Sequence, residues 1–265
     1  GTDYFHDNSE FKGRVIVTTI NKFMYVALNN KHNKECRISY SETENVKNVN
    51  YIKHDIIREG LKLFKVKNGI ELTTIADIPS SGSGLASSSA LSVGLCRVLS
   101  GFKKIKTNNK IDAENACKIE IVKCKKPIGM QDQYATAHGG LNKIEFFNNK
   151  VIVKKINLSN KHLKDFNNNL FLFYTGINRK ADSILSKIIK SGNHLKNYEN
   201  LSKLAKDFEK ELLLRNFSSC GEILHENWML KKNLHQSVSS LNLDDIYKTA
   251  LNSGAIGGKL LGAGG

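Results

Sequence analysis

The stretch Ile78-Pro-Ser-Ser-Gly-Ser-Gly-Leu-Ala-Ser-Ser-Ser-Ala90 decides how the rest of the chain is interpreted. Gly82 and Gly84 permit backbone turns in which a Cβ atom would clash. Residues 90–99 follow with an apolar spacing that predicts a helix. Because a helix N-terminus has unpaired N–H donors and a partial positive charge, it attracts phosphate groups. The stretch therefore predicts a phosphate-binding loop that leads into a helix, with a flexible Gly/Ser linker as the alternative.

The context favours the loop, because a strand-like segment at 69–75 precedes it and an apolar helix follows it. The loop is not a Walker A motif, since no Lys follows its glycines. It is not a dinucleotide-binding fingerprint either, since the third glycine is absent.

The length and charge of the chain set broad limits. Its 265 residues can form one large domain or two smaller ones. The formal charge of +15 raises nucleic-acid binding as an alternative, but the lysines are spread along the sequence and no zinc-finger, KH or RRM signature occurs. We therefore predict no nucleic-acid partner, and we expect the positive field to steer anionic substrates. No apolar run approaches the roughly 20 residues of a membrane helix, so no membrane partner is predicted.

The cysteines indicate a reducing environment. There are five, an odd number, and no Cys-x-x-Cys pair occurs, so neither a disulfide framework nor a structural zinc site is expected. Reduced thiols predict a cytoplasmic protein. Whether it forms a homo-oligomer is left open.

The pattern of apolar residues predicts an α+β fold. Strands dominate the first half and helices the second, which suggests two lobes divided near residues 159–169. The predicted strands cover 14–20, 23–28, 36–40 and 69–76, a hairpin of 140–147 with 151–156, and a buried apolar strand at 170–174. The predicted helices cover 51–64, 87–100, 112–124 and 134–138, and the chain is expected to be mainly helical from 176 to about 251.

A phosphate loop requires a cation, and Mg²⁺ prefers oxygen ligands. Ser88 offers a hydroxyl at the start of the helix, and Glu120 offers a carboxylate in an otherwise apolar segment, where an unpaired charge is costly. A salt bridge to Lys123 is the alternative for Glu120. Asp132 begins a small-residue helix, where it is either an N-cap or a group aimed at a substrate hydroxyl.

The loop resembles motif 2 of the GHMP kinases, with Ala86 at a position that is usually Gly. Within this superfamily the chain resembles the D-glycero-D-manno-heptose 7-phosphate kinases. The most specific stretches are Gln131-Asp-Gln-Tyr-Ala135 and His225-Glu-Asn-Trp228. Met130 replaces a Lys that many relatives carry.

The resemblance implies a two-lobed GHMP kinase fold. An N-terminal ATP-binding domain with a mixed or antiparallel sheet would cover residues 1–165. A helix-rich, ferredoxin-like C-terminal domain would cover residues 166–265. The chain begins inside motif 1 at Gly1 and stops within motif 3 at Gly265. We therefore expect it to be the central part of a longer protein, and we expect this part to lack the C-terminal strands of the fold.

The resemblance also implies roles for individual residues, with ATP and Mg²⁺ as cofactors. The triphosphate would be held by Gly82, Ser83, Gly84, Leu85, Ala86, Ser87 and Ser88. Ser88 and Glu120 would bind Mg²⁺, and Asp132 would be the catalytic residue that orients or deprotonates the acceptor hydroxyl. The sugar would be bound by Asp3, Asp132, Thr175, Gly176, Gly262, Ala263 and Gly264.

The implied activity is that of a sugar kinase. ATP would phosphorylate the anomeric hydroxyl of D-glycero-D-manno-heptose 7-phosphate to the 1,7-bisphosphate, in the biosynthesis of nucleotide-activated heptose. A kinase of a free sugar such as galactose, fucose or mannose is one alternative, because the distal-phosphate pocket is not located, although Lys22 and Arg179 are candidates for it. A catalytically silent sugar or nucleotide sensor is another, and the presence of Ser88, Glu120 and Asp132 argues against it.

Overall fold

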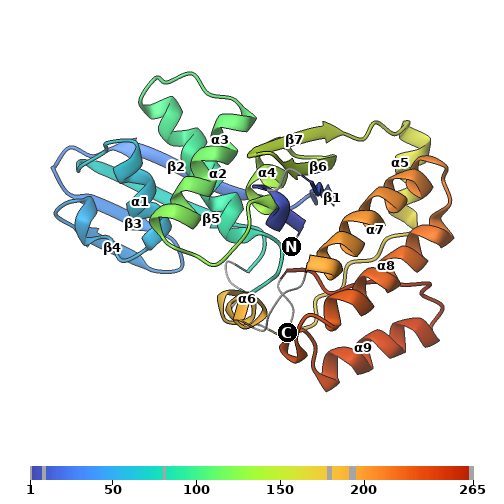
Figure 1. The fold of residues 1–265 in the computed structure, drawn as a ribbon. Coiled ribbons are helices and arrows are strands. Elements are labelled where there is room, and N and C mark those ends of the chain that lie inside the picture. The colour runs from blue at the N-terminus through green and yellow to red at the C-terminus, as the bar shows by residue number, and fades with distance from the viewer. Residues whose placement is uncertain (1, 8–9, 80–81, 178–180, 191–194, 263–265) are drawn as a thin grey trace. The chain divides into compact units, whose positions relative to one another are not determined.

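The computed structural model describes residues 2–7, 10–79, 82–177, 181–190 and 195–262. The internal contacts divide the chain into two compact units (Figure 1). The central unit is Thr19–Gly139, and the flanking unit joins Gly1–Thr18 to Gly140–Gly265. The domain boundary expected between residues 165 and 166 refers to family domains and stays a prediction.

The central unit contains a mixed four-stranded sheet in the order β2-β5-β3-β4. Its strands are β2 (Met24–Asn30), β3 (Cys36–Ser39), β4 (Thr43–Val46) and β5 (Ile70–Ala76). Strands β3 and β5 are parallel, and the other pairs are antiparallel. All four strands contain β-branched residues, and three fall where the sequence predicts strands.

The helices of the central unit gather around α2 (Ser87–Phe102), which contacts strand β2 of this sheet. They are the 3₁₀ turn η2 (Val49–Tyr51), α1 (Asp55–Leu63), α2 itself, α3 (Asn109–Cys117), the π-helical η3 (Lys118–Lys123) and α4 (Gln131–His138). Helix α2 is the centre of the packing, since it contacts β2, α1, α3, η3 and α4. The helix predicted at 51–64 begins only at Asp55, after the 3₁₀ turn.

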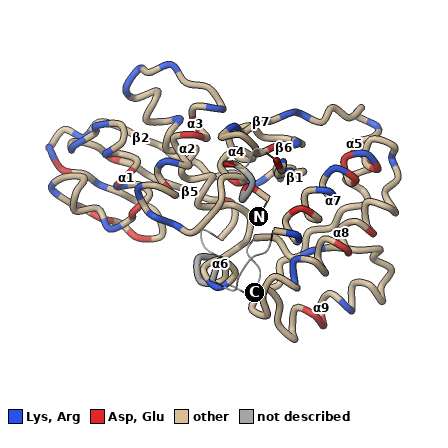
Figure 2. The backbone as a smooth tube through the Cα atoms, viewed as in Figure 1, with Lys and Arg blue, Asp and Glu red and all other residues tan. Residues whose placement is uncertain are grey.

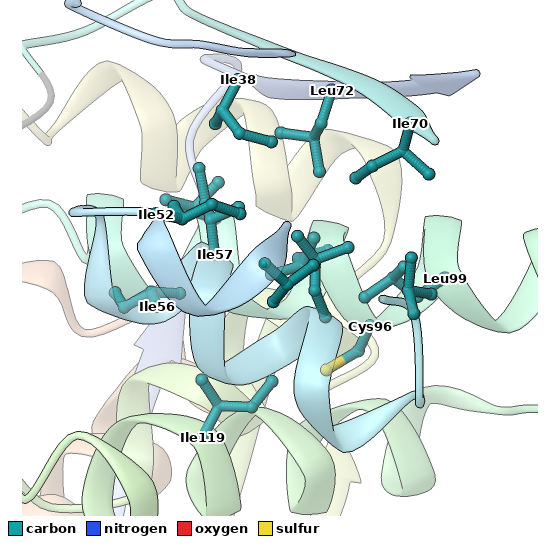
Figure 3. Packing of buried hydrophobic residues seen from close by; sticks show 14 of the residues in the cluster. Ile38, Ile52, Ile56, Ile57, Ile70, Leu72, Cys96, Leu99 and Ile119 are labelled. Carbon is teal, nitrogen blue, oxygen red and sulfur yellow. The ribbon is translucent and has the colours of Figure 1, made fainter. Parts of the chain in front are cut away.

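A single apolar core joins the sheet to the helices. Ile38, Ile70 and Leu72 point from the strands toward Ile57 and Leu99 on the helices (Figure 3). Each side chain of this size contributes about 1.5–3 kcal/mol when it is fully buried. This core fixes α2 and therefore the loop that precedes it.

The flanking unit has an antiparallel sheet in the order β1-β6-β7. Its strands are β1 (Gly13–Thr18), β6 (Leu141–Phe147) and β7 (Lys150–Lys155), and the 3₁₀ turn η1 (Thr2–Phe5) precedes them. The register pairs Gly13 with Phe146 and Thr18 with Leu141. The hairpin prediction is confirmed, and Asn148 and Asn149 form its turn with φ of 50° and 55°.

Helices make up the rest of the flanking unit in its described part. They are α5 (Asn160–Asn168), α6 (Ala181–Lys190), α7 (Leu195–Leu213), α8 (Phe217–Lys232), the 3₁₀ turn η4 (Gln236–Val238) and α9 (Leu241–Asn252). One apolar cluster lies around Leu212 and Phe166, and a second surrounds Trp228. None of the described helices combines the length and apolarity that a membrane crossing requires.

The buried strand predicted at 170–174 is wrong. These residues form no strand, and Phe171 and Phe173 are 79% and 73% exposed. The physical reason is that a strand needs a neighbour, and no strand in the described part of the chain pairs with this one. An apolar run alone does not supply that neighbour.

The α+β fold with one mixed and one antiparallel sheet is confirmed. Among the described residues from 156 to 262 there is no strand. The ferredoxin-like arrangement of the C-terminal lobe therefore stays a prediction.

Candidate functional site

The loop before α2 has an unusual backbone. Gly82, Gly84 and Ala86 have φ values of 72°, 69° and 57°, so left-handed residues occur at every second position. Such alternation turns successive N–H groups to one side and forms an anion-binding concavity. Ala86 carries the Cβ that disfavours this conformation. The local conformation therefore suits a negatively charged ligand.

The N-terminus of α2 is left without a cap. Its N-cap residue, Ala86, makes no side-chain hydrogen bond, and the first turn has no acidic residue. Helices α1, α3, α4 and α9 each have an Asp in the first turn, whereas α5, α7 and α8 have no acidic residue there either. The N–H groups of residues 87–89 have no partner within the helix, and they meet the positive end of its dipole. A bound anion would accept hydrogen bonds from these N–H groups and would interact favourably with the helix dipole.

Two serine hydroxyls hold the loop together. Ser83 Oγ and Ser87 Oγ are 3.0 Å apart, and Ser87 Oγ also donates to the carbonyl of Pro79 at 3.2 Å. The backbone N–H of Leu85 donates to Ser83 Oγ at 3.4 Å. Because the Ser87 side chain is used inside the loop, its contribution to a ligand would come from its backbone N–H.

Glu120 lies in a π-helical turn that continues α3. The N–H of Cys124 donates to the carbonyl of Ile119 at 2.9 Å, which is the i→i+5 bond of such a turn. π turns are frequent at functional sites because they re-aim one side chain. The Glu120 side chain is fully buried, and its Oε1 accepts a 2.9 Å hydrogen bond from Gln133 Nε2.

The salt bridge between Glu120 and Lys123 is not formed. Lys123 is exposed, and no ion pair to Glu120 occurs among the described residues. Glu120 Oε2 is buried without a hydrogen-bond partner in the described part of the chain. The carboxylate is therefore buried but only half satisfied.

Asp132 lies beside this pair. It belongs to the first turn of α4, directly before Gln133, and its side chain is half-buried. The N-cap of α4 is Met130, so the N-cap interpretation of Asp132 is wrong. Because Gln133 contacts Glu120, the two acids are separated by one hydrogen bond and one step along the chain. The structure thus brings Glu120 and Asp132 into one neighbourhood, on helices that both pack against α2.

The residues present fit a magnesium ion. Glu120 Oε2 is an orphaned carboxylate oxygen, and Ser88 places a hydroxyl in the first turn of α2. Mg²⁺ is commonly held by one or two oxygen ligands from the protein together with water and phosphate oxygens. Within the described ranges no three His, Cys, Asp or Glu side chains converge.

The other predicted residues belong to the flanking unit. Asp3 is buried in η1, Thr175 Oγ1 accepts the N–H of Ile177 at 3.3 Å, and Gly176 has a φ of 73°. The carbonyl of Gly262 accepts a 2.5 Å hydrogen bond from Lys231 Nζ.

Three predicted residues, Ala263, Gly264 and the candidate Arg179, lie outside the described residues. The other candidate for a distal phosphate, Lys22, is exposed in the central unit. Lys and Arg occur on elements of both units (Figure 2).

An open groove of about 590 Å³ lies along β2 and α2, and Tyr25, Ile75 and Arg97 are among its lining residues. None of the predicted site residues lines it. The groove is therefore separate from the phosphate loop.

Sequence reasoning missed one member of the site. Gln133 is fully buried and bonds to Glu120, yet it received no role. Its position inside the specific stretch Gln131–Ala135 was the available signal.

Residues 50–140 match the GHMP kinases N terminal domain. This region of the chain is therefore similar to a GHMP kinase N-terminal domain. The chain is 36% identical over 198 residues to D-glycero-alpha-D-manno-heptose 7-phosphate kinase of Campylobacter jejuni. That alignment covers 73% of this chain and 58% of the relative, so the chain spans less than two thirds of that curated relative.

Solved structures show the same fold. A D-glycero-D-manno-heptose 1-phosphate kinase from Bacteroides thetaiotaomicron superimposes with a TM-score of 0.76 at 21% identity, over 97% of this chain and 79% of that one. Lactococcus lactis galactokinase, solved with galactose, gives 0.71 at 18% identity, over 99% and 79%. The GHMP kinase fold predicted from the sequence is confirmed.

Proposed function

We propose that the protein is an ATP-dependent sugar kinase that phosphorylates the anomeric hydroxyl of D-glycero-D-manno-heptose 7-phosphate. The single observation that carries the proposal is the pairing of an uncapped helix N-terminus at Ala86 with the buried, half-satisfied carboxylate of Glu120. An anion and a cation are the ligands that these two features need. The Campylobacter jejuni relative supports the choice of acceptor.

The proposed mechanism assigns most of the work to positioning. The N–H groups of residues 87–89 hold the triphosphate in line with the acceptor. Glu120 and Ser88 would hold Mg²⁺, which when bound would neutralise charge on the phosphates. Asp132, in the first turn of α4, accepts the hydrogen bond of the sugar hydroxyl and takes its proton as the bond to phosphorus forms.

A substrate panel tests the acceptor. The intact protein is incubated with ATP and Mg²⁺ and with heptose 7-phosphate, galactose, fucose or mannose, and ADP release is measured. We expect turnover with the heptose phosphate and little with the free sugars. Turnover of a free sugar alone would identify a kinase of free sugars. No turnover with any acceptor would favour a catalytically silent sensor.

Replacing Asp132 tests the mechanism. Asp132→Asn keeps the size of the side chain and removes its ability to take a proton, so we expect turnover to fall by at least ~10²-fold. Asp244→Asn is the control, because Asp244 lies in the first turn of α9 and contacts Lys232 and Ser239. A purified Asp132→Asn protein with near wild-type turnover would rule out the base role.

A further inference from the structure

Glu120 and Gln133 form a buried polar pair whose hydrogen bonding is incomplete. Both side chains are fully buried, and one hydrogen bond of 2.9 Å joins Gln133 Nε2 to Glu120 Oε1. Glu120 Oε2 and Gln133 Oε1 are both buried without a partner in the described part of the chain. Two acceptor oxygens at one location therefore lack a donor.

Other buried acids of the same unit are saturated. Asp112 is fully buried, and it is bonded to the Arg97 guanidinium and, at 2.6 Å, to Thr107 Oγ1. Glu44 accepts from the hydroxyl of Tyr40 and from two backbone N–H groups. The fold therefore provides hydrogen-bond donors to the carboxylates of Asp112 and Glu44, whereas Glu120 Oε2 has none among the described residues.

A buried carboxylate with one unsatisfied oxygen destabilises the fold unless a ligand binds to that oxygen. An ionised carboxylate loses its hydration on burial, and one neutral amide replaces only part of it. The lysines nearest in sequence, Lys118 and Lys123, are exposed. No described lysine therefore supplies the partner of Glu120 Oε2, and a cation bound from outside the described residues would supply it.

Gln133 decides which oxygen receives that group. Its amide comes from α4, whereas Glu120 comes from η3, so the hydrogen bond fixes the carboxylate across two elements. With Oε1 engaged in this hydrogen bond, Oε2 is the oxygen with no partner and the better placed to bind a cation. A side chain without a donor at position 133 would leave the carboxylate free to rotate and unable to present one oxygen consistently.

We propose that Gln133 is a positioning residue that clamps Glu120 by one carboxylate oxygen so that the other binds the metal ion. This inference rests on the proposed function, since it takes Glu120 as a ligand of Mg²⁺. Partners that orient metal ligands typically contribute 10–100-fold to metal affinity.

The test measures metal binding without turnover. Mn²⁺, which reports on a Mg²⁺ site, is titrated into the intact protein with a non-hydrolysable ATP analogue, and free Mn²⁺ is followed by electron paramagnetic resonance. Gln133→Met keeps the length of the side chain and removes the donor, and we expect its Mn²⁺ dissociation constant to rise 10–100-fold. Ile119→Val is the control, because it loosens packing directly beside Glu120 and leaves the hydrogen bond intact.

A double variant separates positioning from packing. If Gln133 acts through Glu120, then Gln133→Met has no further effect on Mn²⁺ binding in a Glu120→Gln background. Equal weakening by Gln133→Met and Ile119→Val, or an additional loss in the double variant, would overturn the inference. If Gln133→Met alone does not fold, restored folding in the double variant supports the clamp, and persistent unfolding contradicts it.

The outcome also distinguishes this inference from the proposed function. If wild-type protein binds Mn²⁺, Glu120→Gln binds it measurably more weakly and Gln133→Met binds like wild type, the positioning role is wrong and the metal assignment stands. If wild-type protein and Glu120→Gln bind Mn²⁺ equally, both proposals fail.

Discussion

Replacing Glu120 with Gln should raise stability and abolish activity. The substitution keeps the shape of the side chain and removes a fully buried charge that has one hydrogen bond. The new amide can still accept from Gln133 Nε2, and it can donate to the orphaned Gln133 Oε1. Because a buried charge is lost and an unsatisfied acceptor gains a donor, we expect the free energy of unfolding in EDTA to rise by about 1–3 kcal/mol.

Bound ligands should make the wild-type protein more stable than Glu120→Gln. Mg²⁺ with an ATP analogue at 100 times its dissociation constant stabilises a binding-competent protein by about 2.7 kcal/mol. Wild-type protein should gain this amount, whereas Glu120→Gln should gain much less. A stability increase without ligand, combined with a loss of ligand stabilisation, is typical of a residue kept for function.

The assay is urea unfolding followed by far-UV circular dichroism, with hydrogen exchange of peptides from residues 109–139 to localise the change. Trp228 is the only tryptophan, and it lies in the flanking unit, so its fluorescence reports on the other part of the chain. Asp112→Asn is the matched control. It removes a charge that Arg97 and Thr107 satisfy, so it should destabilise by about 1.5–3 kcal/mol.

The reasoning is refuted if Glu120→Gln is less stable than wild type in EDTA by more than about 1 kcal/mol, the net worth of an ordinary hydrogen bond. Glu120 would then be a structural partner of Gln133, as Asp112 is of Arg97. Its assignment to the metal would lose its physical basis.

Three further predictions concern stability. Gly60→Ala and Gly101→Ala share a gain in helix propensity of up to about 1 kcal/mol, but a Cβ at Gly60 would overlap the buried Leu95 Cδ2, whereas Gly101 has open space. Urea unfolding should therefore show Gly60→Ala to be less stable than Gly101→Ala by about 1–3 kcal/mol. Ala86→Gly should stabilise by about 0.5–1 kcal/mol, because relief of the left-handed strain exceeds the added entropy of the unfolded chain. Burial raises the pKa of Glu44, but hydrogen bonds from the backbone N–H groups of Lys53 and His54 and from the Tyr40 hydroxyl lower it by more, so the net shift is downward. Stability that Glu44 contributes should thus be present above about pH 4.5 and be lost as pH falls through the lowered pKa, so wild type and Glu44→Gln should converge in acid.

Each of these three predictions has an outcome that would contradict it. Equal stabilities of the two glycine variants would mean that α1 and α2 move apart freely. A loss of stability in Ala86→Gly would mean that the loop conformation changes with the residue. A constant difference between wild type and Glu44→Gln from pH 7 to pH 3 would show that the pKa of Glu44 is not lowered by folding.

Local patterns predict the elements of this fold well and their partners poorly. The helix after Ala86 and the hairpin around Asn148 depend on residues close in sequence, and both are confirmed. The segment 170–174 is as apolar as any strand, but strand formation requires a second strand that the segment itself does not specify. The pairing of β1 with β6 joins segments more than 100 residues apart, and no local period indicates it.

In the candidate site, too, single residues can be predicted from the sequence, whereas their partners cannot. Glu120 could be chosen from sequence because a carboxylate in an apolar helix is conspicuous. Gln133 could not, because an amide is unremarkable until the facing helix is known. The π turn at η3 was equally invisible, since it changes the direction of one side chain without changing the composition.

The two units divide the proposed tasks. The phosphate loop, Ser88, Glu120, Gln133 and Asp132 all lie in the central unit, which contains nearly the whole matched family domain. The other residues predicted to bind the sugar lie in the flanking unit. The proposed nucleotide and metal binding therefore depends only on residues inside one compact unit. The choice of acceptor depends on both, so substitutions in the flanking unit should alter the KM for sugar while nucleotide affinity is unchanged.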